Sequence, residues 1–118
     1  MGNKIEKRSM SFNILIRKEG DYCIAHCLEL DIVATAKNLK SVQDDIFDLI
    51  KAQVGYAFSN GNLDNLYHPA PPEVWKEFFE CKEAWEKKVS ASQADDSLET
   101  FVPPWIIATM CQAANCHA

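Results

Sequence analysis

The chain has 118 residues, of which 47% are hydrophobic and 25% are charged, and its formal net charge at pH 7 is −5. This length and composition are typical of one globular domain with its own hydrophobic core. The acidic balance argues against non-specific binding to nucleic acids, because contacts with phosphate groups need a basic surface. Residues 1–8 are polar and precede no signal-peptide-like apolar segment, and the uncharged residues 101–118 contain two prolines. We therefore predict a cytoplasmic protein with no membrane association.

Residues 11–59 predict three strands followed by a helix. The segments 11–17 and 22–28 alternate between apolar and polar side chains, as strands with one buried face do. Gly20 beside Asp21 predicts a tight hairpin between them. A third alternating segment covers residues 32–36.

The first strand has one apolar face, formed by Phe12, Ile14 and Ile16, which we expect to pack against the helix. The helix should run from about Val42 to Ser59, with Ser41 as its N-cap and Asn60-Gly61 as its end. The opposite face of the sheet is more polar, and we expect it to meet solvent or a partner.

The C-terminal part predicts a second helix from about Pro72 to Lys88 and an extended segment over residues 105–110. Two prolines precede that segment, which favours a sheet edge or an arm exchanged between subunits. One helix cannot bury all the large aromatic residues of this region against one small sheet, so they are covered either by the loop Asn62 to Pro72 and the segment around Trp105 or by another subunit. We predict a homo-oligomer, a dimer or a tetramer. The predicted oligomer interface comprises Trp75, Phe79, Trp105, Ile106 and Ile107.

The cysteines number five, an odd count in a chain without an export signal, and this predicts free thiols. Cys23 and Cys27 share one face of their strand while His26 points to the other, so these three side chains cannot hold one metal ion. A Cys/His nucleophilic pair built on His26 lacks an orienting acid and a glycine-rich oxyanion loop. We predict no catalytic residue, no metal site and no cofactor.

Four segments together resemble the HicB family of bacterial antitoxins: SFNILIRKEGDYCIAHC, LELDIVATA, LKSVQDDIFDLIKAQV and YHPAPPEVW. The resemblance covers roughly Ser11 to Pro72, about half of the chain. It implies a partial ribonuclease-H-like fold, assembly into oligomers and binding of a small RNA-cleaving toxin of the HicA type. Nothing after Ser97 reads as a helix-turn-helix or ribbon-helix-helix segment, which argues against the DNA binding of full antitoxins.

We therefore expect a single α+β domain over residues 1–118, with its core at 11–72 and a helical and extended C-terminal extension at 73–118. The sheet should have three or four mostly antiparallel strands, with one main helix on one face (βββα) and a second helix appended. The predicted function is a non-enzymatic, HicB-like interaction module that neutralises a toxin by steric occlusion. The predicted contact residues are Asn13, Arg17, Glu29, Asp31, Thr35 and Lys37. Two alternatives remain open: a metal-dependent nuclease or hydrolase, and a nucleic-acid-binding regulator.

Overall fold

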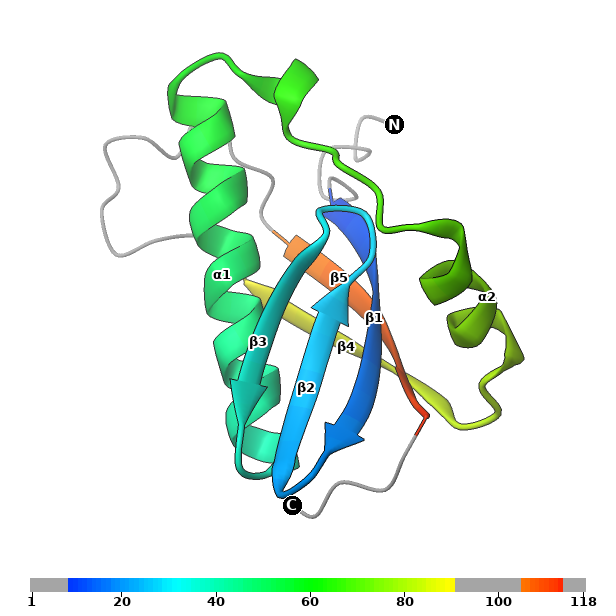
Figure 1. Cartoon of the computed structure of the whole chain (residues 1–118). Coiled ribbons are helices and arrows are strands. Elements are labelled where there is room, and N and C mark those ends of the chain that lie inside the picture. The colour runs from blue at the N-terminus through cyan, green and yellow to red at the C-terminus, as the bar shows by residue number, and fades with distance from the viewer. Residues whose placement is uncertain (1–8, 91–104, 114–118) are drawn as a thin grey trace, which may run out of the picture.

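The computed structural model describes residues 9–90 and 105–113. In chain order the elements are β1 (Ser9–Glu19), β2 (Tyr22–Cys27), β3 (Ile32–Ala36), α1 (Leu39–Ser59), a 3-10 turn η2 (Leu63–Asn65), α2 (Pro72–Glu80), β4 (Ala84–Ser90) and β5 (Trp105–Gln112). The five strands of these residues form one sheet in the order β3-β2-β1-β5-β4 (Figure 1). The α+β class and the mostly antiparallel sheet are confirmed, with one strand more than predicted.

The first three strands form as their alternation predicts. β1 and β2 are antiparallel and end in the register Glu19 opposite Tyr22, with Gly20 at φ 59° in the turn. Glycine adopts this left-handed conformation without the steric cost that a Cβ brings. β3 continues the antiparallel order on the outer side of β2.

The C-terminal strands differ from the prediction. β5 lies inside the sheet, parallel to β1 and antiparallel to β4, and is no edge strand. The prolines that suggested an edge lie outside the described residues. β4 begins at Ala84, within the last residues of the helix that the sequence predicts to end near Lys88. Trp85 and Val89, which both pack against the main core, are four residues apart, a spacing that fits one strand face as well as one helix face.

Helix α1 begins earlier than predicted. Its N-cap is Asn38 and not Ser41: the Asn38 side-chain oxygen accepts a hydrogen bond from the Ser41 backbone N–H at 2.8 Å. Asn side chains cap helices as effectively as Ser because both satisfy a free N–H of the first turn. The end is as predicted, with Asn60 as C-cap and Gly61 at φ 59°.

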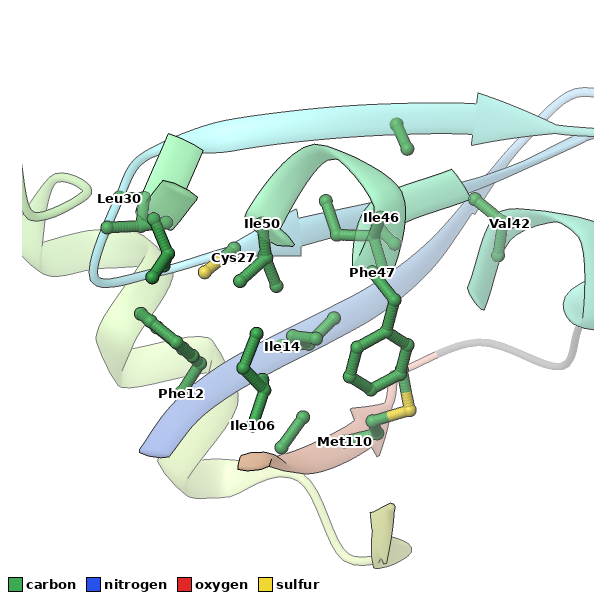
Figure 2. Close-up of a cluster of buried hydrophobic side chains, with 14 of the residues drawn as sticks. Phe12, Ile14, Cys27, Leu30, Val42, Ile46, Phe47, Ile50, Ile106 and Met110 are labelled. Atoms are coloured by element: carbon green, nitrogen blue, oxygen red, sulfur yellow. The ribbon is translucent and has the colours of Figure 1, made fainter. Parts of the chain in front are cut away.

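The main core lies between α1 and one face of the sheet. Phe12, Ile14 and Ile16 are buried there, as expected from the alternation of β1. Figure 2 shows Ile46 and Phe47 of α1 pointing at the sheet, with the Phe47 ring next to Met110 of β5. Burial of apolar side chains on this scale is the main favourable term in folding.

Helix α2 packs on the opposite face of the sheet. Its Phe78 joins a second buried cluster, completed by Leu15, Leu28, Ala70 and Cys111. A disulfide bond links Cys81, which follows α2, to Cys111 of β5. The second face of the sheet was expected to be open to solvent or a partner, whereas α2 covers its β1–β5 half.

The prediction of free thiols is wrong for this pair, because α2 and β5 bring the two cysteines to a Cα–Cα distance of 6.1 Å, which suits a disulfide. Cys23 is disulfide-bonded as well. Cys27 is a free, buried thiol, as predicted.

Candidate interaction surface

The half of the second sheet face that α2 leaves uncovered belongs to β2 and β3. We call it the outer sheet face and define it by Tyr22, Ile24, Val33, Thr35 and Lys37. Tyr22 is 46% exposed and Val33 48% exposed. The ammonium group of Lys37 lies 6.0 Å from the centroid of the Tyr22 ring. A small surface that mixes an aromatic ring, aliphatic side chains and a cation is suited to contact with another protein.

The turn between β2 and β3 is fastened to β1 by Glu29. One carboxylate oxygen accepts the Asn13 backbone N–H at 2.7 Å, and the other accepts the Asn13 side-chain amide at 2.6 Å. Hydrogen bonds to a carboxylate are short and strong because the acceptor is charged. Asn13 and Glu29, two of the predicted contact residues, therefore hold each other in place and position the turn.

Asp31 and His26 form a second contact at the same turn. Asp31 has φ 55°, a left-handed conformation that Asp tolerates better than most residues. Its Oδ1 lies 2.7 Å from Nε2 of His26, whose side chain is buried. This pair was missed by the sequence analysis. The sequence does place His26 and Asp31 five residues apart across a short turn, a spacing that allows a contact. The contact forms because the left-handed backbone at Asp31 directs its carboxylate back towards β2.

The segment that connects α1 to α2 also hydrogen-bonds to the β2–β3 turn. The His68 N–H donates to the Glu29 carbonyl oxygen at 3.0 Å, and the Ala70 N–H donates to the Leu28 carbonyl oxygen at 2.8 Å. Burial, followed by the charge of Glu29, raises the pKa of the Tyr67 hydroxyl above its usual value of 10.0. The β2–β3 turn, which supports the outer sheet face, is thus hydrogen-bonded both to β1 and to the segment that precedes α2.

The remaining predicted contact residues separate into two groups. Arg17 is half-buried, and its guanidinium lies 3.7 Å from the Glu77 carboxylate of α2, at the border between the covered and open halves of the face. Thr35 and Lys37 are exposed on the outer sheet face. The structure therefore brings all six residues to one side of the sheet, but Asn13 and Glu29 serve the fold of that side.

The predicted oligomer interface is not one surface. Ile106 is fully buried in the main core, so its assignment to a contact surface is wrong: in a strand inside the sheet it faces the core. Ile107 points to the other face and is half-buried. Trp105 has the Lys88 ammonium 4.6 Å from its ring centroid. Trp75 is partly buried against the second cluster, and only Phe79, 72% exposed, is left as a large apolar side chain on α2.

Cys27 cannot act as a nucleophile with His26. The two side chains leave neighbouring positions of β2 on opposite faces, and Cys27 is buried in the main core. Burial raises the pKa of the Cys27 thiol from 9.0 to about 12. The thiol is therefore protonated at neutral pH and lacks the thiolate that nucleophilic catalysis needs.

This raised pKa makes stability depend on pH in a defined direction. The unfolded chain loses the Cys27 proton above about pH 9 while the folded chain keeps it up to about pH 12. The stabilisation is thus fully present below pH 9 and is lost as the pH rises towards 12, by up to about 1.4 kcal/mol per pH unit. Urea unfolding between about pH 8 and pH 10.5 should show a steeper loss of stability for the native chain than for Cys27→Ala. Equal slopes would contradict the burial of this thiol.

An open pocket of about 420 Å³ lies beside the disulfide. It is lined by Glu77, Glu80, Cys81, Lys82, Glu83, Gln112 and Ala113. Among the described residues no group of three His, Cys, Asp or Glu side chains is placed to hold a metal ion. None of the described helices is long and apolar enough to cross a membrane.

Comparisons of the chain with known protein families, with curated proteins and with solved structures found no significant match.

Proposed function

We propose that this chain is a non-enzymatic protein-interaction module resembling the HicB antitoxins, and that it neutralises a small RNA-cleaving toxin by steric occlusion. The observation that carries the proposal is the outer sheet face, where exposed Tyr22, Val33 and Thr35 sit on a firmly held support. The βββα order of the first four elements agrees with what the resemblance implies. A rigid surface loses little conformational entropy on binding, which favours affinity.

The hydrogen bonds of the β2–β3 turn support this use of the surface. Asn13, Glu29, His26 and Asp31 are joined pairwise at 2.6–2.7 Å, so the strands that carry the exposed side chains cannot shift independently. Tyr22 is the residue on which we place most of the binding energy, because Tyr is enriched among the residues that dominate protein interfaces. Thr35 and Lys37, which lie near Tyr22 on the same face, would bind polar groups of the toxin.

The proposal is tested by measuring RNA cleavage by a purified HicA-type toxin with increasing amounts of this chain. We expect cleavage to stop at a stoichiometric ratio, and Tyr22→Ala to weaken the inhibition by about 1–2 kcal/mol. Tyr56→Ala is the matched control, since Tyr56 is an exposed tyrosine on α1. Full cleavage at a large excess of the chain would refute the proposal, and RNA cleavage by the chain alone would support the nuclease alternative instead.

A cytoplasmic location remains a prediction. The Cys81–Cys111 disulfide is of a kind that persists in oxidising compartments and is rare in the cytosol. Alkylation of the protein in intact cells, followed by mass spectrometry, measures directly whether these two thiols are paired where the protein works. A reduced pair in cells would agree with a cytoplasmic location.

A further inference from the structure

The two edges of the sheet differ in how they resist pairing with another strand. β4, at one edge, carries Glu86, Lys87 and Lys88 in its middle, and such charges oppose pairing. β3, at the other edge, has the sequence IVATA, with no charge and no proline, and keeps an uninterrupted register with β2. Among the described residues no strand lies on the outer side of β3. β3 is therefore the edge that can accept a further strand.

We propose that β3 pairs antiparallel with β3 of a second copy of this chain, forming a two-fold symmetric dimer with one continuous sheet. Two-fold symmetry requires a surface that is complementary to itself. β3 and its flanking residues meet this requirement when Ala34 lies on the symmetry axis. Val33 then lies opposite the partner's Thr35, and Ile32 lies opposite the partner's Ala36.

The charges at the two ends of β3 favour a second copy of β3 as the pairing strand, and they favour the antiparallel direction. Asp31 precedes the strand, Lys37 follows it, and both are exposed. In the antiparallel arrangement each Asp31 lies opposite the partner's Lys37, which gives two identical ion pairs. A parallel arrangement would place like charges together at both ends, which is destabilising.

Both charged side chains are already held on one face of the sheet. Asp31 contacts His26 through Oδ1, and no hydrogen bond within the described residues reaches its Oδ2. Lys37 lies beside the ring of Tyr22, which belongs to the same face. The second carboxylate oxygen and the ammonium group are thus available to a partner on that face, and ordering them requires little further loss of side-chain freedom.

An exposed leucine on α1 gives independent support. Helix α1 lies over β3 and β2, and Figure 2 shows its Phe47 directed towards Met110 of β5. Leu49 is two residues further on, about 200° around the helix, and so points back towards the β3 edge. It is 41% exposed there. A second copy seated on β3 would bring its own α1 against this side of the helix and cover Leu49.

The proposed pairing goes beyond the proposed function and does not depend on it. It uses the backbone edge of β3 and the charged residues at its two ends, whereas the toxin would bind mainly through Tyr22, Val33 and Thr35; Lys37 borders both surfaces. Pairing would place two outer sheet faces side by side on one continuous sheet. Because the dimer can be measured on the isolated chain, its failure would leave the toxin assay unaffected.

Sedimentation equilibrium of the full chain tests the proposal. We expect the native chain to form a species of twice the 13.3 kDa chain mass. Lys37→Glu should raise the dissociation constant about tenfold, because each of the two ion pairs becomes a repulsion. Lys87→Glu makes the same charge change on β4 and should leave the dimer unchanged.

A charge exchange identifies the register. Asp31→Lys and Lys37→Glu should each dimerise poorly alone, but an equimolar mixture restores both opposite-charge pairs and should dimerise like the native chain. Should Asp31→Lys fail to fold because of its left-handed backbone, Leu49→Glu replaces it as a variant expected to weaken the dimer. The proposal is overturned if the native chain sediments as a monomer at every concentration, if Lys37→Glu behaves as Lys87→Glu does, or if the folded mixture gains nothing over its components.

Discussion

Removing the Cys81–Cys111 disulfide by the double substitution Cys81→Ser and Cys111→Ala should lower the free energy of unfolding by about 3–4 kcal/mol. The two cysteines are 30 residues apart in sequence, so the bond restricts a long loop of the unfolded chain. Without it the unfolded state gains the conformational freedom of that loop, while the folded state keeps its sheet register. Urea unfolding of the variant and of the native chain measures the difference.

The double substitution separates this bond from the other cysteines. A reductant would also break the disulfide of Cys23, whereas the double variant leaves Cys23 and Cys27 untouched. Adding reductant to the double variant measures the contribution of the Cys23 bond by itself. If the native chain and the double variant unfold at the same urea concentration under oxidising conditions, the bond is not formed in the protein.

The position of this disulfide explains why it matters for the proposed surface. Cys81 immediately follows α2 and Cys111 lies in β5, so the bond fixes the end of the helix to the second face of the sheet. α2 itself has only nine residues, a length at which an isolated helix is marginal in water. The boundary between the covered and open halves of the face therefore depends on this covalent link and on the packing of Phe78.

The first half of the fold could be predicted because its local signals agree with one another. The alternation around Phe12, Ile14 and Ile16, the glycine turn at Gly20 and the helix end at Gly61 each have a local physical cause. The second half could be predicted only in part: α2 begins at Pro72 and β5 at Trp105, as expected, but β4 and the place of β5 in the sheet depend on distant partners. Trp85 and Val89 suit a helix or a strand equally, and only the place of β4 beside β5 decides between them.

The candidate surface was predicted in part for the same reason. Strand alternation correctly places Arg17, Thr35 and Lys37 on one side of the sheet. It cannot show that Glu29 bonds Asn13 sixteen residues away, or that α2 returns to cover Leu15. It also cannot show that cysteines thirty residues apart meet. Each of these facts is a tertiary contact between segments with no local pattern in common.

Phe78→Ala should be as damaging as loss of the disulfide, with a decrease of about 3–5 kcal/mol in the free energy of unfolding. Phe78 is the buried aromatic residue of α2 and packs with Leu15 and Leu28. Its removal leaves a cavity in a small cluster that cannot easily collapse around it. Thermal and urea unfolding of the variant measure the loss.

The neighbouring residue supplies the control. Phe79 is 72% exposed, and its ring lies at centroid distances of 6.0 Å from Trp75 and 5.7 Å from Phe78. Phe79→Ala should therefore change the free energy of unfolding by about 0.5 kcal/mol or less. The two substitutions remove the same atoms one position apart on the same short helix, so a difference between them reports which side of α2 faces the sheet. Equal losses would mean that α2 does not lie on the second face in the way described, and the outer sheet face would then have no fixed border.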